Sequence, residues 1–278
     1  MKNFATLASL LALALSLSAC VATDEPLLDT ETRTISVEQN AEPAGVNVAQ
    51  SVAHLLPATG PTYVTLTITR VNKFEDTKKD TGKSAITSGS GFIADPSGYV
   101  LTAAHVAHKK DYLVSARAAN GRIYSGTVID VNPANDMALI KLRGYAGKAV
   151  TPADSSCLTR GSMVYSLGRP HASGDTARIG SLESMRFGRP VAYGKFGYPD
   201  ALVVRMSTRK GESGGPLFND NGHLVGMVVS TLSDQTGQSI NLAHAVYGAT
   251  LAEFFCSRAA CSDRWAALAR SSPGACEG

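Results

Sequence analysis

Gly211-Glu212-Ser213-Gly214-Gly215-Pro216 decides the fold, because two upstream segments complete a catalytic set with it. Thr102-Ala103-Ala104-His105 offers an imidazole base, and Asn135-Asp136-Met137-Ala138-Leu139 offers a carboxylate. A serine hydroxyl is a weak nucleophile at neutral pH unless an adjacent imidazole takes its proton. The imidazole in turn needs an acceptor that fixes its tautomer and stabilises the imidazolium. The segments predict the set of a serine protease: Ser213 as nucleophile, His105 as general base and Asp136 as the orienting carboxylate.

The glycines around Ser213 allow a tight turn and a close approach of substrate. We expect the backbone N–H groups of Gly211 and Ser213 to form an oxyanion hole, which stabilises charge as the tetrahedral intermediate forms. The stretch also satisfies Gly-x-Ser-x-Gly, the elbow of α/β-hydrolases, which leaves a lipase or esterase as an alternative. That fold needs a helix directly after the serine, whereas Gly214-Gly215-Pro216 disfavours a helix.

Two further residues compete for the roles of base and carboxylate. His108 precedes the charged stretch Lys109-Lys110-Asp111, which we expect to be exposed. Asp130 lies within the strand before Asp136. Asp136 itself enters an apolar run, where an unpaired carboxylate would be costly to bury, and it is therefore preferred. We expect the other histidines to be surface or satisfied polar residues: His54, His171, His223 and His244.

The three segments and their flanks resemble the trypsin-like (chymotrypsin-fold) serine protease superfamily, and are closest to its bacterial HtrA-type branch. The resemblance covers about residues 58–255 and rests on these stretches: Ser88-Gly89-Ser90-Gly91-Phe92-Ile93, Gly98 to Val106, Asn135 to Leu142, Leu167-Gly168-Arg169-Pro170 with Gly180-Ser181-Leu182, and Gly222-His223-Leu224-Val225-Gly226-Met227.

The pattern of apolar residues predicts an all-β fold with two antiparallel β-barrels. Residues 63–69 alternate apolar side chains with threonine, as strands do. Similar short runs recur in two blocks, separated by turn residues and by a linker at about 143–160. We expect a first barrel at about 58–145 and a second at about 160–250, with the catalytic residues on their facing rims. The Ala- and Leu-rich tail, at about 247–269, predicts one or two helices.

The first twenty residues predict export. Lys2 precedes an apolar run and then Leu17-Ser18-Ala19-Cys20, which is typical of a signal peptide. The cysteine resembles that of a bacterial lipobox, so Cys20 is the expected lipidation site; ordinary cleavage near Ala19 or Ala22 is the alternative. The resemblance implies the periplasmic side of the outer membrane. Residues 21–57 show no sustained period and predict a flexible tether.

The other four cysteines form an even set in an exported chain, which suggests disulfide bonds. Three pairings are possible, and the short spacing of Cys256 and Cys261 favours a small loop, with Cys157 then paired to Cys276. Cys256, Cys261 and Cys276 lie in a predicted C-terminal helical and disulfide tail, residues 256–278. The sequence has no Cys-x-x-Cys pair, the spacing that would favour a zinc site. We expect no metal and no cofactor.

Composition and length limit the classes of partner and domain that we expect. The net charge of +3 is too small to indicate nucleic acid. Nothing after residue 20 approaches the apolar run of about 18 residues that a membrane span needs. We expect no PDZ domain after the protease domain, since 65 residues follow Ser213 and the barrel needs about half of them. The oligomeric state stays open.

Glu212 departs from the resemblance, because the HtrA branch has asparagine there. Trypsin relatives that mature from a zymogen have aspartate, which pairs with a newly cut N-terminus, so activation by proteolysis is one interpretation. The other is that Glu212 faces solvent or bonds neighbouring backbone. By the same resemblance the substrate pocket has Ser207 at its base and the segment near Val228 to Thr231 along its side, with Val229, Ser230 and Thr231 as the pocket residues. This wall carries no carboxylate, so small or medium apolar side chains are the expected preference.

The sequence therefore predicts an exported, lipid-anchored serine endopeptidase that cleaves polypeptides through an acyl-enzyme. Envelope protein processing or quality control is the role that the resemblance implies. A catalytically silent binding or scaffold lipoprotein with the same fold is the alternative, because the geometry of a triad cannot be seen in sequence.

Overall fold

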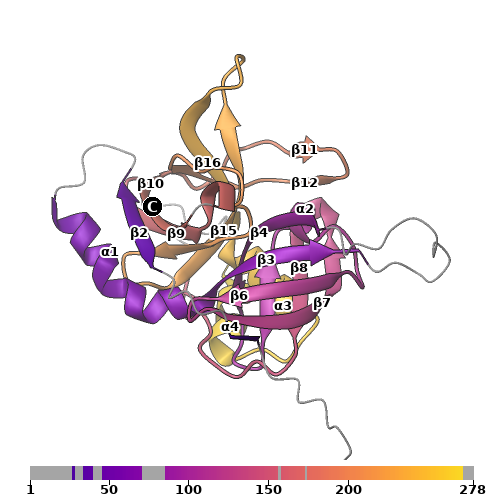
Figure 1. The fold of residues 1–278 in the computed structure, drawn as a ribbon. Coiled ribbons are helices and arrows are strands. Elements are labelled where there is room, and N and C mark those ends of the chain that lie inside the picture. Colours follow the sequence, from indigo (N-terminus) through magenta and orange to yellow (C-terminus); the bar gives the residue numbers. More distant parts are fainter. Residues whose placement is uncertain are drawn as a thin grey trace, which may run out of the picture.

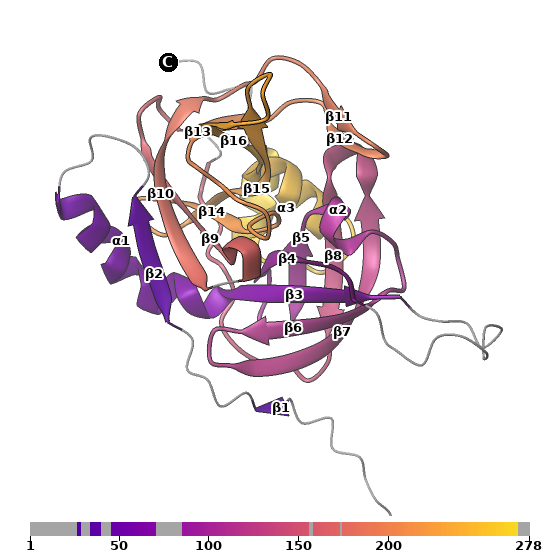
Figure 2. The same ribbon diagram turned by 45° about the horizontal axis from the view of Figure 1, so that its top comes forward.

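Two closed six-stranded antiparallel barrels make up the core of the molecule (Figure 1). The structure is a computed structural model that describes residues 27–28, 34–39, 46–70, 85–155, 158–172 and 174–271. Figure 2 shows the barrels side by side, one built mainly from the first half of the chain and the other from the second. The predicted fold class is confirmed.

In the first barrel the strands pair in the order β6-β3-β4-β5-β8-β7, and β7 closes the ring on β6. The bounds are β3 Tyr63–Thr69, β4 Ala85–Ile93, β5 Tyr99–Thr102, β6 Leu113–Ala118, β7 Arg122–Asn132 and β8 Met137–Leu142. A short strand, β1 (Leu27–Leu28), pairs with β7. The alternation read in residues 63–69 coincides with β3, whose buried residues point into this barrel.

The second barrel has the order β13-β16-β15-β14-β9-β10, closed by the pairing of β13 with β10. Its strands are β9 Met163–Gly168, β10 Asp175–Ser184, β13 Leu202–Arg205, β14 Pro216–Asn219, β15 Leu224–Ser233 and β16 Ser239–Tyr247. Between β10 and β13 the chain forms a separate two-stranded hairpin, β11 (Val191–Tyr193) with β12 (Phe196–Tyr198).

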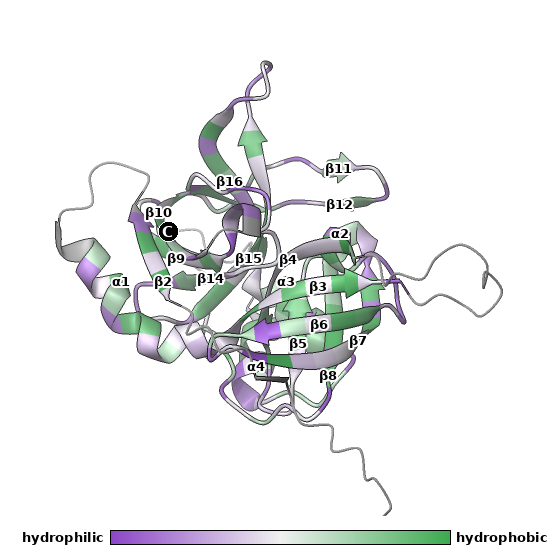
Figure 3. Cartoon of the chain, in the orientation of Figure 1, coloured by the Kyte–Doolittle hydropathy of each residue, from purple (hydrophilic) through white to green (hydrophobic). Residues whose placement is uncertain are grey.

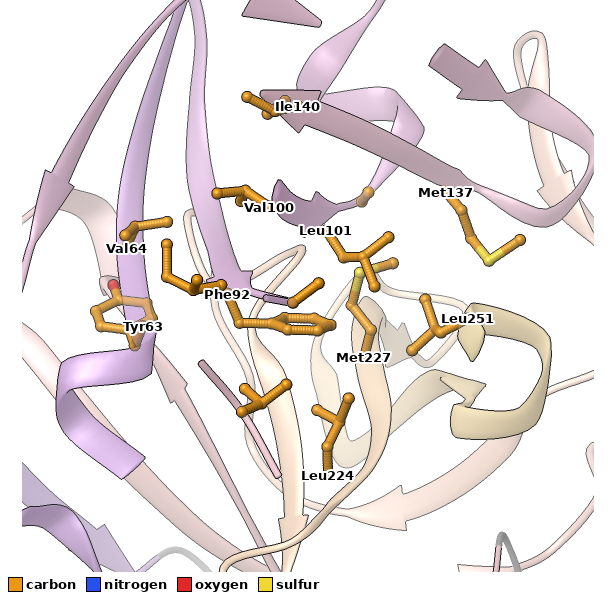
Figure 4. Packing of buried hydrophobic residues seen from close by; sticks show 14 of the residues in the cluster. Tyr63, Val64, Phe92, Val100, Leu101, Met137, Ile140, Leu224, Met227 and Leu251 are labelled. Atoms are coloured by element: carbon orange, nitrogen blue, oxygen red, sulfur yellow. The ribbon is translucent and has the colours of Figure 1, made fainter. Parts of the chain in front are cut away.

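A continuous apolar core joins the two barrels. Figure 4 shows Phe92 and Leu101 of the first barrel beside Met227 and Leu224 of the second, with Leu251 of a C-terminal helix next to them. Hydrophobic residues gather on the barrel strands, whereas the tip between β15 and β16 is hydrophilic (Figure 3). The shared core fixes the two barrels against each other and therefore fixes the rims on which the candidate site lies.

Two C-terminal helices close the molecule, α3 (Gly248–Cys256) and α4 (Asp263–Arg270). Trp265 of α4 is buried, and its indole Nε1 donates to the Ala94 carbonyl at 2.8 Å. Cys256 and Cys261 form a disulfide between the helices, as their spacing suggested. Cys157 and Cys276 lie outside the described residues, so their pairing stays a prediction.

The prediction of a flexible tether at residues 21–57 is wrong for two segments. Ile35–Gln39 forms β2, which pairs in parallel with β10, and Val46–Thr59 forms helix α1. Both pack along the second barrel (Figure 1). Their order comes from contacts with residues far along the chain, which a search for local periodicity does not detect. None of the helices in the described residues is long and apolar enough to span a membrane.

Candidate active site

His105 and Asp136 meet on the rim of the first barrel. His105 lies in α2 (Ala104–Ala107), a single turn that follows β5. Its Nδ1 lies 2.8 Å from Asp136 Oδ2, and its backbone N–H donates to Asp136 Oδ1 at 2.9 Å. Asp136 is fully buried, whereas about a quarter of the His105 side chain is exposed. The carboxylate therefore fixes both the ring and the backbone of His105 and leaves one edge of the imidazole accessible.

The backbone at Asp136 is turned so that its carboxylate reaches α2. A short turn of 3-10 helix, Pro133–Asn135, ends at Asp136, which adopts the left-handed conformation with φ +46° and ψ +46°. The Asn132 side chain accepts from the Asn135 N–H and begins this turn. Aspartate tolerates the left-handed region better than most residues. The Asn-Pro signal before Asp136 thus serves to aim the carboxylate out of the barrel wall.

Two hydrogen bonds anchor the loop of the candidate nucleophile, residues 211–215 (the nucleophile loop), to the first barrel, and a third bond supports them within that barrel. Ser90 of β4 donates from its N–H to the Ser213 carbonyl at 2.9 Å and from its Oγ to the Gly211 carbonyl at 2.8 Å. Thr102, three residues before His105, donates to the Ser90 carbonyl at 2.7 Å. The nucleophile loop belongs to the second barrel, and these bonds hold it close to the segment that carries His105.

Gly211 and Gly214 have backbone conformations that side chains disfavour, with φ of +100° and +84°. A Cβ at Gly211 would lie 2.4 Å from the Arg169 carbonyl oxygen, and one at Gly214 would lie 2.2 Å from the Ser90 carbonyl oxygen. Both are closer than any real contact. Glycine is therefore required at these two positions of the turn.

Ser213 is half-buried, and its Oγ donates to the Val229 carbonyl at 3.3 Å. Among the described residues this is the hydrogen bond that the Ser213 hydroxyl makes. His105 is therefore hydrogen-bonded to Asp136, but Ser213 is not hydrogen-bonded to His105. Catalytic hydrogen bonds are often long or misaligned before substrate binds. Neither the Gly211 nor the Ser213 N–H donates to a backbone acceptor within the described chain, which leaves both groups available to a ligand.

Glu212 is buried rather than exposed. One of its carboxylate oxygens pairs with Arg178 Nε of β10, and the other accepts from the Arg209 N–H at 2.5 Å. Arg178 also donates to Glu38 of β2 at 2.7 Å. Burial raises the pKa of Glu212, while the Arg178 guanidinium acts in the opposite direction. Glu212 therefore does not face solvent, and its bond to the neighbouring backbone of Arg209 was expected, whereas the ion pair with Arg178 was not foreseen. Activation by proteolysis stays a hypothesis.

Tyr193 is a site residue that the sequence did not reveal. Its phenol donates to Asp136 Oδ2, the oxygen that also faces His105 Nδ1. The tyrosine lies in β11, 57 residues after Asp136 in sequence, and no motif marks it. Its ring stands edge-on to the His105 ring, with centroids 5.8 Å apart.

The competing residues have other partners. Asp130 forms an ion pair with Arg258 and accepts from the Val131 N–H. His108 itself is half-buried, with its ring 6.1 Å from that of Phe196, whereas the charged stretch 109–111 after it is exposed as expected. Burial lowers the pKa of His108, and Lys195 and His105 lower it further. Of the other histidines, which were expected at the surface or in satisfied polar positions, the most buried is His244. Its Nδ1 lies 2.7 Å from the Tyr198 hydroxyl.

The residues expected to form the substrate pocket lie on two adjacent segments. Val229 is buried in β15, and Ser230 and Thr231 follow it as half-buried residues. Ser207 is half-buried just after β13, and the neighbouring Thr208 hydroxyl lies 2.6 Å from that of Thr231. The strand β14 begins directly after the nucleophile loop, so the helix that an α/β-hydrolase requires is not there and that alternative is wrong.

Comparison with protein families agrees with this geometry. A family model described as a trypsin-like peptidase domain matches residues 89–227, which is half of the chain. This span contains the His105, Asp136 and Ser213 segments and both strands that flank the nucleophile loop.

Curated relatives carry protease names. The chain is 33% identical over 155 residues to the putative serine protease HhoA of Synechocystis sp., covering 54% of this chain and 38% of that protein. It is 29% identical over 167 residues to a probable periplasmic serine endoprotease DegP-like of Brucella suis, covering 59% and 31%. The chain thus spans between about a third and two fifths of the length of these relatives.

Solved structures share the fold. The inactive form of the Rv3671c protease from M. tuberculosis H37Rv matches with a TM-score of 0.58 and 22% identity, over 77% of this chain and 93% of that one. The HtrA-type protease AlgW with tripeptide matches with a TM-score of 0.58 and 24% identity, over 70% and 59%. At these identities the likeness concerns the fold alone.

Proposed function

Because the chain belongs to the trypsin-like peptidase family, we propose that it is a serine endopeptidase with His105, Asp136 and Ser213 as its catalytic residues. The observation that carries the proposal is the double contact of one buried carboxylate with both the ring and the backbone of His105. A buried charge needs such partners, and this pair points the free edge of the imidazole outward.

The reaction follows from these positions. Ser213 Oγ attacks the carbonyl of the scissile peptide bond while His105 Nε2 takes its proton. Asp136 accepts from Nδ1 and stabilises the imidazolium that forms. His105 then gives the proton to the leaving amine, and the acyl-enzyme remains on Ser213. A water molecule activated by His105 hydrolyses this ester and restores the serine.

For the first step Ser213 must exchange its hydrogen bond to Val229 for one to His105. The bond to the carbonyl is 3.3 Å long, which is longer than the usual O–H···O distance of about 2.5–3.0 Å, so little is lost when the hydroxyl turns. The Gly211 and Ser213 N–H groups would then hold the oxyanion; removal of one such donor typically costs about 10²–10³ in rate.

The pocket residues support a preference for small or medium apolar side chains at the cleaved bond. Ser207, Ser230 and Thr231 are uncharged, and Val229 contributes an apolar wall. A substrate lysine or arginine would find no carboxylate among them. The substrate class is therefore proposed to be polypeptides exposed by unfolding, in which such side chains are accessible.

Export and lipidation at Cys20 complete the proposal. One relative is named a periplasmic endoprotease, and the signal-like start of the chain agrees with that location. Residues 1–20 lie outside the described part, so their role rests on the sequence alone. A Cys20→Ala protein should move from the membrane fraction to the soluble envelope fraction. Its continued retention on the membrane would contradict the anchor.

A catalytically silent scaffold is the second candidate, and the Ser213–Val229 hydrogen bond favours it. In that case the hydroxyl would stay turned from His105. The deciding experiment is proteolysis of an unfolded, reduced polypeptide by the purified chain, with Ser213→Ala as control. Cleavage by the wild type alone supports the peptidase, and equal stability of the polypeptide with both proteins supports the scaffold.

A further inference from the structure

The hairpin of β11 and β12, here residues 190–199, lies over the catalytic histidine. Figures 1 and 2 both place it above α2. Phe196 and Tyr193 stand edge-on to His105, with ring centroids 6.4 Å and 5.8 Å away. The hairpin leaves the second barrel between β10 and β13 but packs against the turn before Asp136, which belongs to the first. It therefore spans the boundary between the barrels.

Two tyrosines attach this hairpin to opposite barrels. Tyr193 donates to Asp136 of the first barrel, and Tyr198 contacts Ser230 Oγ at 2.8 Å and His244 Nδ1 at 2.7 Å in the second. Tyr198 makes no described hydrogen bond to Asp136. The same hairpin thus offers one tyrosine that touches the catalytic carboxylate and one that does not.

We propose that Tyr193 is a positioning residue that holds the Asp136 carboxylate in place for His105, an inference that rests on the peptidase function proposed above. Three donors converge on this carboxylate: the His105 N–H at Oδ1, and both His105 Nδ1 and the Tyr193 hydroxyl at Oδ2. With Oδ2 shared, the carboxylate cannot rotate without breaking two bonds.

Tyr193 keeps its proton in this role. Burial raises the pKa of its phenol far above the ordinary value, and the Asp136 charge raises it further. The hydroxyl is consequently a donor throughout the working range of the enzyme. A phenol that donates to Oδ2 also neutralises part of the carboxylate charge that the imidazolium would otherwise feel.

Loss of the phenol hydrogen bond acts on His105 through Asp136, because the carboxylate is then free to rotate away from Nδ1 of the imidazole. The other titratable groups near α2 are His108 at its end, and Lys195 and Tyr198 on the hairpin. A Tyr193→Phe substitution leaves these three groups in place, so a change at His105 reports on Asp136.

The test is NMR of isotope-labelled histidine in the full chain, with wild type, Tyr193→Phe and Tyr198→Phe proteins. Phenylalanine keeps the ring packing of each tyrosine and removes the hydroxyl alone. We expect the ring resonances of His105 to move in Tyr193→Phe and to stay in place in Tyr198→Phe. Unmoved His105 resonances in Tyr193→Phe, or an equal movement in both variants, would overturn the proposal.

A kinetic measurement separates this inference from the peptidase function. On a peptide substrate, Tyr193→Phe should lower kcat about tenfold with KM nearly constant. If the wild type hydrolyses nothing while the His105 resonances move in Tyr193→Phe, the proposed function fails and the positioning role stands. If the wild type is active and kcat does not change in Tyr193→Phe, the positioning role fails alone.

Discussion

Arg178 and Glu212 form a buried ion pair next to Ser213, the proposed nucleophile: the arginine side chain is 1% exposed and the glutamate side chain 3%. Glu212 stands between Gly211 and Ser213, the two residues whose N–H groups are proposed to hold the oxyanion. The positive charge that zymogen-type relatives obtain from a newly cut N-terminus is here supplied by a side chain of β10. The arrangement therefore gives the acid a partner without cleavage of the chain.

Removal of the Arg178 side chain should lower the free energy of unfolding. Arg178→Met leaves the Glu212 charge buried without its cation, and loss of one partner of a buried pair destabilises by about 3–5 kcal/mol. Urea unfolding of the variant measures this loss. The matched control is Glu38→Gln, which removes the other partner of Arg178; because the Glu38 side chain is 40% exposed, we expect less than about 1 kcal/mol.

A double variant checks the reasoning. In Arg178→Met with Glu212→Gln no charge is left buried, so much of the lost stability should return. Should the double variant be as unstable as the sum of the two single variants, the ion pair would not be the cause.

Gly214 offers a test of the turn. Gly214→Ala should destabilise by more than about 2 kcal/mol and abolish activity, because its Cβ would collide with the Ser90 carbonyl and its φ is positive. Gly237 has the same φ of +84° with nothing within 4 Å of a Cβ. Gly237→Ala should therefore cost only about 1 kcal/mol of strain. The two variants are compared by thermal unfolding and by their rates of peptide hydrolysis. Equal losses of stability and activity would show that the collision is unimportant.

His244 predicts an acid sensitivity of the fold. Burial, aided by the Arg189 charge, lowers its pKa from 6.5 to about 4. Between these values the unfolded chain binds a proton and the folded chain does not, so stability falls as pH drops through this window. By pH 5 the free energy of unfolding should have fallen by on the order of 2 kcal/mol through this group.

The measurement is the free energy of unfolding in urea at pH 7.5 and at pH 5, for the wild type and His244→Asn. Asparagine keeps an acceptor for the Tyr198 hydroxyl but does not titrate. We expect the wild type to lose more stability than the variant on acidification. An identical loss in the two proteins would assign the pH dependence to other groups.

Local patterns of apolar residues predicted the barrels, and the three motifs with their family resemblance predicted that His105 pairs with Asp136. Strand β3 follows its alternation of apolar residues, and the Cys256–Cys261 loop follows its short spacing. Strand β2 and helix α1 were missed because they are ordered by the second barrel, far away in sequence. No spacing rule links Tyr193 to Asp136 or Arg178 to Glu212, and only the closed barrels bring these residues together.

The central claim is that Ser213 is an activated nucleophile, and covalent labelling with a fluorescent phosphonate tests it most directly. The full chain should take up the label without prior cleavage, with the modification mapped to Ser213, while Ser213→Ala and His105→Ala proteins should stay unlabelled. A folded wild-type chain that takes up no label, or a label that persists in Ser213→Ala, would contradict the account.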